Sequence, residues 1–210
     1  MTRVKICGLT REEDVDAAIK MGADAVGFVF YPKSKRYIAP DVAKRLIDRV
    51  PPYVMTVGLF VNESPEIIER ILREIPLSLL QFHGVESLKD CERYARPYVK
   101  AVRVNRKTDF LEIQAEFISA KGFLLDADSA AFGGSGQTFD WSLIPNHLKK
   151  PVILAGGLNT ENIVEAIRQV NPYAVDVSSG VESQPGIKCH NKMQVFIDNV
   201  RREGSRIHDK

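Results

Sequence analysis

Cysteine is scarce in this chain, and its pattern excludes two common kinds of site. The 210 residues include Cys7, Cys91 and Cys189, which are odd in number and far apart. That spacing fits neither a disulfide framework nor a zinc ribbon built from paired Cys-x-x-Cys units. The four histidines show no His-Glu-x-x-His pattern. We therefore expect no structural or catalytic metal site.

Long apolar runs and a marked excess of charge are also missing. The longest apolar runs, 23–30 and 54–61, are interrupted well short of the roughly 20 residues that a membrane span requires. The first eight residues contain neither a long apolar core nor a small-residue cleavage site. The formal net charge of +2 does not indicate nucleic-acid binding, because such binding requires cations clustered on one face of the protein. These absences predict a cytoplasmic protein with no membrane or nucleic-acid partner.

Short β-branched runs alternate with longer helical patterns from one end of the chain to the other. We expect strands at 4–7, 25–30, 54–61, 77–82, 98–104, 122–126, 152–155 and 174–178, and helices at 11–21, 39–50, 65–75, 86–94, 109–118, 141–147, 160–170 and 191–202. Eight units of about 26 residues predict an α/β fold, a single-domain (β/α)8 barrel over 1–203 with a polar tail at 204–210. A doubly wound open sheet is the alternative, disfavoured by the unit count and by the missing Gly-x-Gly-x-x-Gly after the first strand.

Polar or small residues close most of these strands, at the end where such a barrel builds its active site. They are Cys7, Arg36, His83, Arg103, Asp126, Asp128, Gly156, Gly157, Ser178, Ser179 and Gly180. The loops at 156–157 and 179–180 follow the last two strands, where small residues let backbone N–H groups approach phosphate oxygens. We interpret them as a phosphate site, with two ordinary strand-to-helix turns as the alternative.

Four further features each have a functional and a purely structural interpretation. Cys7 is a reactive thiol at the barrel mouth or a buried small hydrophobe. Asp126 closes an apolar strand that desolvates its carboxyl group, or it forms a turn or helix cap, a role that suits Asp128 better. Arg36 captures a substrate carboxylate through its planar fork or belongs to a solvated basic turn. The loop at 133–138 is a lid over the substrate or a flexible linker.

Side-chain alternation makes a structural prediction for Lys5. It shares parity with Cys7 and should point into the barrel, where an unpaired ammonium group would be costly. The last strand must neighbour the first when the barrel closes, and it carries Asp176. We therefore expect a buried Lys5–Asp176 ion pair.

Eight segments in register resemble one family over nearly the whole chain. They are 4–10, 27–30 with 34–37, 57–62, 80–84, 125–126, 133–136 with 139–141, 154–158 and 175–182. Together they resemble the phosphoribosylanthranilate isomerases of tryptophan biosynthesis. Any one of these motifs alone is weak, whereas the eight together are highly specific.

This resemblance implies an Amadori rearrangement of N-(5-phosphoribosyl)anthranilate to 1-(2-carboxyphenylamino)-1-deoxyribulose 5-phosphate. The family's general base falls on Cys7 and its general acid on Asp126. The expected substrate-binding residues are Arg36, His83, Gly156, Gly157, Ser179 and Gly180, with Arg36 meeting the anthranilate carboxylate. No metal or organic cofactor is implied. We expect a monomer or homodimer whose partner is a small phosphorylated substrate.

One departure and three alternatives accompany the resemblance. Cys189 stands where the family usually has an Asp opening the last helix, and losing such a cap costs about 1 kcal/mol if nothing replaces it.

A sibling isomerase of histidine biosynthesis would carry Asp in place of Cys7. A Schiff-base aldolase would need Lys5 or Lys100 accessible to substrate. A phosphometabolite-binding module without activity would lack the acid or the base.

Overall fold

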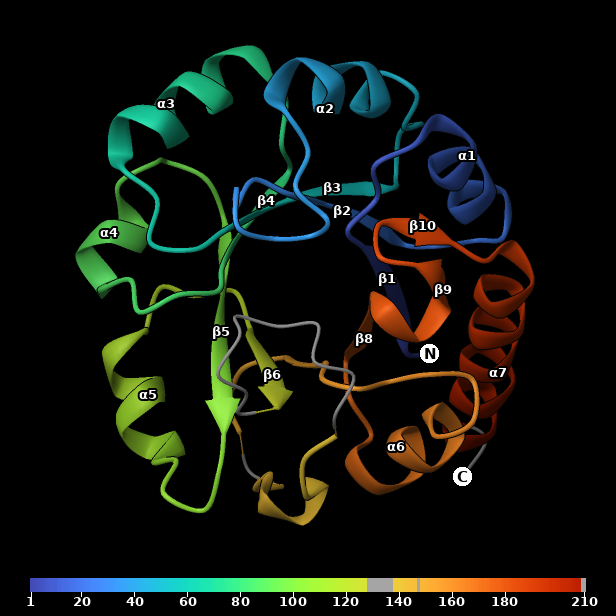
Figure 1. Ribbon diagram of the computed structural model, residues 1–210. Coiled ribbons are helices and arrows are strands. Elements are labelled where there is room, and N and C mark those ends of the chain that lie inside the picture. The colour runs from blue at the N-terminus through green and yellow to red at the C-terminus, as the bar shows by residue number, and fades with distance from the viewer. Residues whose placement is uncertain (128–137, 147, 209–210) are drawn as a thin grey trace.

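Eight parallel strands form a closed barrel at the centre of the molecule, with the helices outside it (Figure 1). The computed structural model describes residues 1–127, 138–146 and 148–208. The strands are β1 (Arg3–Cys7), β2 (Ala25–Val29), β3 (Met55–Phe60), β4 (Leu79–Phe82), β5 (Tyr98–Val104), β6 (Phe123–Ala127), β7 (Val152–Leu154) and β8 (Ala174–Val177). β1 pairs with β8 as well as with β2, which closes the sheet and confirms the predicted (β/α)8 barrel.

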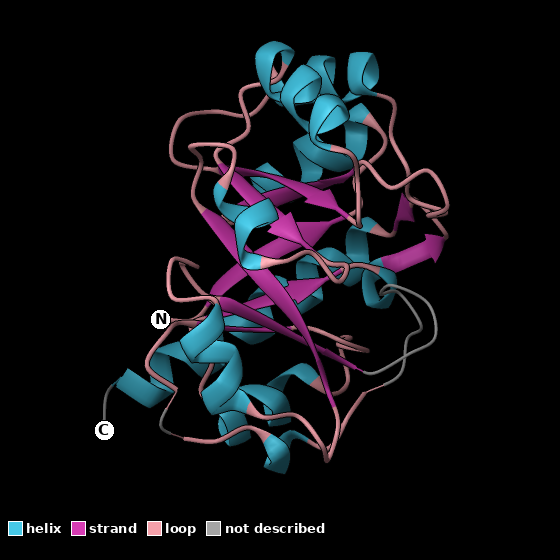
Figure 2. Ribbon diagram, turned by 90° about the vertical axis from the view of Figure 1, so that its left-hand side faces the viewer, coloured by secondary structure: helices cyan, strands magenta, loops and turns pink. Residues whose placement is uncertain are grey.

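The helices surround the strands, and both termini lie on the same side of the molecule (Figure 2). They are α1 (Glu12–Lys20), α2 (Pro40–Ile47), α3 (Pro65–Glu74), α4 (Leu88–Glu92), α5 (Phe110–Glu116), α6 (Ile163–Val170) and α7 (His190–His208). Two 3₁₀ turns, η1 (Trp141–Leu143) and η2 (Ser179–Val181), and a hairpin of β9 (Glu182–Gln184) and β10 (Ile187–Lys188) complete the described elements. Among the described helices, none is long and apolar enough to cross a membrane.

The local sequence explains where the helices begin and which face they bury. α2 and α3 each have proline in the first turn, where the missing N–H costs no hydrogen bond. Ile68 and Ile71 of α3 are buried, as the helical spacing predicts. Between the strands and these helices Phe60 stacks on Phe30, with ring centroids 5.3 Å apart. The main core therefore lies between the sheet and the helices. The inside of the barrel holds other side chains, polar ones among them.

Two of the predicted helix boundaries are wrong by the widest margin. The helix expected at 141–147 is only the turn η1, because Ile144 precedes Pro145 and a residue before proline is driven out of helical geometry. α7 continues to His208, past the expected end at 202. Its extension is held from α6, because Arg168 donates to the buried Glu203 at 2.8 and 3.1 Å. The division into a barrel domain and a terminal segment stays a prediction.

Candidate active site

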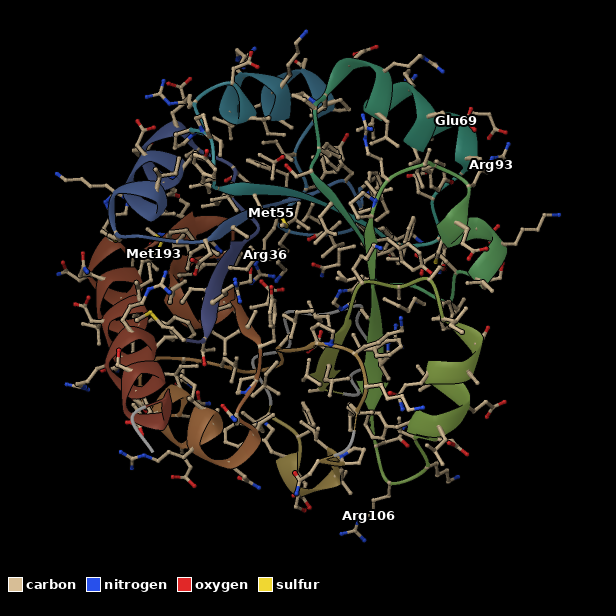
Figure 3. All side chains as sticks on the ribbon, turned by 180° about the vertical axis from the view of Figure 1, so that it is seen from behind. Arg36, Met55, Glu69, Arg93, Arg106 and Met193 are labelled. Carbon is tan, nitrogen blue, oxygen red and sulfur yellow. The ribbon has the colours of Figure 1, made fainter. Side chains whose placement is uncertain are left out.

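A pocket at the carboxyl ends of the strands brings most of the predicted site residues together. It is lined by Cys7, Arg36, His83, Asp126, Gly156, Gly157 and Ser179, with Gly180 next in the chain. These residues come from segments after or at the ends of six different strands. Figure 3 shows Arg36 toward the barrel centre, whereas Glu69 and Arg93 lie on the outer helices. The closure of the barrel is therefore what assembles this site.

Lys5 and Asp176 form the buried ion pair that side-chain alternation predicts. The Lys5 Nζ lies 2.9 and 3.0 Å from the two carboxylate oxygens of Asp176. Burial lowers the pKa of Lys5, but the charge of Asp176 and the neighbouring Cys7 outweigh it and the net shift is upward. A fixed ammonium group therefore lies beneath the thiol.

Burial raises the pKa of the Cys7 thiol, against the opposing charges of Lys5 and Lys188. The thiol is therefore the main form at neutral pH. Gly27 stands opposite Cys7 in the register of β1 and β2. A Cβ at Gly27 would lie 3.0 Å from the Cys7 Sγ and 3.0 Å from the Lys5 Cε, so glycine is what leaves room for both groups.

Hydrogen bonds hold both carboxyl oxygens of Asp126. The Oδ2 lies 3.0 Å from the Nε2 of His83, and the Oδ1 accepts from the Ala127 N–H at 2.8 Å. Gly156 packs against this carboxyl group, since a Cβ there would lie 2.7 Å from the Asp126 Oδ1. His83 thus contacts the predicted acid, an arrangement that its position after β4 did not reveal.

Arg36 is part of an ion network that sequence reasoning missed. Its Nε and Nη2 donate to the two carboxylate oxygens of Glu182 at 2.8 and 2.7 Å. Lys188 Nζ donates to the same carboxylate at 2.8 Å. Burial opposes the charged form of Glu182, but Arg36 and Lys188 lower its pKa overall. The guanidinium is therefore held in a fixed orientation at the pocket wall, with a side chain still 14% exposed.

Glycine geometry shapes the two predicted phosphate loops. Gly156 and Gly157 have φ values of 78° and 64°, a left-handed conformation that glycine adopts without strain. Asn162 donates to the Gly157 carbonyl at 2.9 Å, which anchors the loop after β7. A Cβ at Gly180 would overlap the Leu158 carbonyl oxygen. The two loops are therefore packed directly on each other.

The loop after β8 is also tied to the segment that carries the thiol. Ser178 Oγ donates to the Cys7 carbonyl at 3.0 Å. Lys188 Nζ donates to the Ser178 carbonyl at 3.2 Å. The predicted base and the predicted phosphate loop thus share one hydrogen-bond network.

A residue from another element supports the start of the last helix, where Cys189 departs from the family pattern. Asp14 of α1 is buried, accepts from the Lys188 N–H at 3.1 Å and lies 2.9 Å from the His190 Nε2. The Cys189 N–H donates to the Val181 carbonyl at 2.8 Å. Asp14 of α1 therefore holds the residues on both sides of Cys189, through the Lys188 N–H and the His190 ring rather than through backbone N–H groups of the first helical turn.

Two lysines weigh against the aldolase alternative, and the described residues offer no cluster of metal ligands. Among those described residues, no group of three His, Cys, Asp or Glu could hold a metal ion. Lys100 is buried away from the pocket, where its Nζ donates to the Gly84 carbonyl and pairs with Glu86. Lys5 is held by Asp176. Neither amine is placed for a Schiff base with substrate.

The predicted lid falls largely outside the described residues. Residues 133–137 and Asp128 are among those the structure does not describe, so the lid and the cap role of Asp128 stay predictions. Phe139 and Trp141, at the far end of the loop, are partly buried and pack against the core.

A closed parallel barrel with a thiol, a carboxyl group and two glycine loops at its carboxyl mouth defines a phosphate-binding (β/α)8 enzyme. The model of the N-(5'-phosphoribosyl)anthranilate (PRA) isomerase family matches residues 4–199. The N-(5'-phosphoribosyl)anthranilate isomerase of Dechloromonas aromatica is 51% identical over 206 residues, which cover 98% of this chain and 99% of the relative. The chain therefore belongs to the N-(5'-phosphoribosyl)anthranilate isomerase family.

Solved structures agree with this assignment. The crystal structure of phosphoribosyl anthranilate isomerase from Thermotoga maritima matches with a TM-score of 0.89 and 46% identity, covering 96% of this chain and all of that one. A phosphoribosyl anthranilate isomerase in complex with reduced 1-(o-carboxyphenylamino)-1-deoxyribulose 5-phosphate matches with a TM-score of 0.85 and 44% identity, at the same coverage. Solved isomerases of this family thus share the barrel fold of this chain.

Proposed function

We propose that Cys7 and Asp126 perform the isomerisation of N-(5'-phosphoribosyl)anthranilate as general base and general acid. The isomerisation itself, a step of tryptophan biosynthesis, is the activity of the family to which the chain belongs. The observation that carries the proposal is the placement of a buried thiol and a buried carboxyl group in one pocket beside two glycine loops. They come from β1 and β6, so substrate can lie between them.

The chemistry needs two groups with different roles. Asp126 donates a proton to the furanose ring oxygen, the bond from that oxygen to carbon 1 breaks, and carbon 1 becomes an iminium ion. Cys7 then takes the proton from carbon 2, and the electron pair of that bond neutralises the iminium to give an enolamine. Tautomerisation of the enolamine yields the ketone product, with no net gain or loss of atoms.

The surroundings of Cys7 support its role as the base. A thiol takes up a carbon-bound proton only after it has lost its own. The Lys5 ammonium group and the charge of Lys188 favour the thiolate, while burial opposes it. The thiolate is thus a minor but reactive form at neutral pH.

We assign the anthranilate carboxylate to Arg36 and the phosphate to the loops containing Gly156, Gly157, Ser179 and Gly180. Arg36→Lys keeps the charge but removes the planar fork, so KM should rise while kcat changes little. Arg93→Lys is the control at an exposed site, because Arg93 donates to Glu69 at 3.1 Å on the outside of the molecule and does not line the pocket. A wild-type KM in Arg36→Lys would remove Arg36 from the substrate site.

The whole proposal is tested by mixing purified protein with freshly generated phosphoribosylanthranilate and following the loss of its anthranilate fluorescence. Loss that depends on enzyme concentration is expected. The related aminoaldose phosphate of histidine biosynthesis serves as the competing substrate. Turnover of that compound alone would assign the chain to the sibling isomerase.

For the oligomeric state we propose a homodimer formed through the amino-terminal mouth of the barrel. Tyr53 is fully exposed there with a φ of 72°, a strained conformation for a bulky residue. Met55 and Tyr173 are also exposed, and all three line a cavity of about 480 Å³ whose other walls include Leu124 and Ile153. A structure of the Thermotoga maritima relative is described as monomers generated from a dimeric enzyme. Light scattering decides between dimer and monomer.

A further inference from the structure

Gln81 and His83 form a hydrogen-bonded chain that ends on Asp126. Gln81 lies in β4 and His83 directly follows that strand, so the two share parity and both point into the barrel. The Gln81 Nε2 lies 3.0 Å from the His83 Nδ1, and the His83 Nε2 lies 3.0 Å from the Asp126 Oδ2. Gln81 is 1% exposed and His83 6%. This series of hydrogen bonds is therefore shielded from water.

The direction of these hydrogen bonds follows from the chemistry of the amide group. An amide NH₂ only donates, so the His83 Nδ1 accepts and carries no proton. The ring proton of the neutral imidazole then lies on Nε2, which donates to the Asp126 Oδ2. The Asp126 Oδ1 accepts from the Ala127 N–H. When Asp126 gives up its proton, two N–H donors already face the negative charge that develops.

The other end of Gln81 argues against a purely structural role. Its Oε1 is buried and has no hydrogen-bond partner among the described residues. A buried carbonyl without a partner is destabilising, and an apolar side chain of similar size would avoid that cost. The amide is thus retained where only its donor end is used, and that end faces His83.

We propose that Gln81 is a positioning residue for the isomerisation, which holds His83 in the Nε2–H tautomer and thereby keeps a donor against Asp126. The inference rests on the acid role proposed for Asp126. It also changes the role predicted for His83, which acts on the acid and need not contact substrate.

Nitrogen NMR of the full chain, labelled with ¹⁵N in its four histidines, tests the tautomer without any activity measurement. The signals of His83 are those lost in His83→Asn. In the wild type we expect a protonated Nε2 and an unprotonated Nδ1. In Gln81→Glu the new carboxylate can only accept a hydrogen bond, so Nδ1 should become protonated and donate to it. A wild-type His83 protonated on Nδ1 would overturn the proposal.

Kinetics test the consequence for the acid. Gln81→Met keeps the length of the side chain but has no donor, and kcat should fall about 10-fold to 100-fold, as when the hydrogen-bond partners of metal-binding histidines are removed. KM should stay unchanged, and the pH profile of kcat should shift. Thr56→Val is the control, because Thr56 is a buried residue of β3 that does not line the pocket, and the change removes its hydrogen bond to Ser78.

The outcomes separate the two proposals. A folded Gln81→Met with wild-type kcat and pH profile overturns the positioning role. If Gln81→Met does not fold, the wild-type NMR spectrum and Gln81→Glu still decide it. Near-normal turnover in Asp126→Asn would defeat the acid assignment of the proposed function, while the tautomer of His83 would still be reported by the NMR signals.

Discussion

The two mouths of the barrel are built from the same eight strands but carry opposite chemistry. At the carboxyl mouth, charged side chains are buried and paired, as in Lys5 with Asp176 and Arg36 with Glu182. At the amino mouth, Tyr53 and Tyr173 are exposed beside a cavity with largely apolar walls. Buried charges are stable only with partners, so the carboxyl mouth is rigid and preorganised. The exposed apolar side chains of the amino mouth need no such partners.

The comparison indicates that buried polar residues occur in this fold where the reaction requires them. Replacing a buried ion pair by apolar residues of similar size is often neutral or stabilising. Lys5 and Asp176 are therefore poorly explained by stability alone, and their position under Cys7 gives them a functional reason. Variants at the carboxyl mouth should change catalysis, and variants at the amino mouth should not.

The largest effect is expected from Cys7. Cys7→Ala should lower kcat about 10²-fold to 10⁴-fold with little change in KM, because it removes the general base. Cys7→Ser should also be poor, since a hydroxyl is seldom ionised. Burial raises the pKa of Cys7 above its ordinary value of 9.0. Because the reaction needs the thiolate of Cys7 together with the proton of Asp126, wild-type kcat should follow a bell-shaped pH profile whose limbs belong to the pair.

Cys91→Ala is the control for this prediction. Cys91 is buried on α4, does not line the pocket, and burial raises its pKa to about 12. It should keep wild-type turnover in the fluorescence assay. Near-normal turnover in Cys7→Ala would refute the base assignment.

Asp126→Asn should damage kcat comparably while the protein stays folded. The amide keeps the shape of the carboxyl group but has no proton to transfer to the ring oxygen. Steady-state kinetics and circular dichroism together measure both parts of this expectation. If turnover is retained, the acid role moves elsewhere, with Asp128 as the first candidate.

Lys5→Met should reduce the free energy of unfolding by about 3–5 kcal/mol, because it leaves Asp176 buried without a partner. The double variant Lys5→Met with Asp176→Leu should recover most of that loss. The pKa of Lys5 is raised in the folded state, so the pair contributes fully below the unfolded value of 10.5. That contribution is lost as pH rises through the folded value.

Urea unfolding at pH 8 and at pH 11 measures this dependence. The stability of the wild type relative to the double variant should fall at the higher pH. Equal stability of wild type and Lys5→Met at pH 8 would mean that the pair contributes nothing.

A smaller effect is expected at the phosphate loops. Gly180→Val would force the loop after β8 away from the Leu158 carbonyl. Losing one hydrogen bond to a charged phosphate oxygen costs about 1.5–3 kcal/mol, so KM should rise about 10-fold to 100-fold. Gly22→Asn is the control, since Gly22 also has a positive φ but has open space around it. Unchanged KM in both Gly180→Val and a bulky Gly156 variant would remove phosphate from this mouth.

The smallest catalytic effect is expected at the amino mouth. Tyr53→Ser should leave kcat and KM unchanged, because Tyr53 does not line the active-site pocket. It should weaken self-association in sedimentation velocity if the mouth is the dimer interface. A loss of kcat as large as that of Cys7→Ala would abolish the distinction between the two mouths.

Much of the fold was predictable because its signals are local. Alternating strand and helix patterns, with glycine and proline between them, indicated eight units, and eight parallel units close into a barrel. Closure then made one distant contact predictable, since it places β8 beside β1 and so brings Asp176 to Lys5. Local signals failed at 141–147 and at the end of α7, where a proline and a distant ion pair decided the outcome.

The positions of the predicted site residues were set by the sequence alone, because strand ends gather at one mouth. The partners of those residues were not. Glu182 reaches Arg36 across 146 positions of sequence, and Asp126 reaches His83 across 43. No periodicity relates such pairs, and only the packing of the closed barrel decides which groups face each other. The tertiary structure therefore determined the charge state around Cys7 and the hydrogen bonds on Asp126, because both depend on burial and on neighbours from other strands.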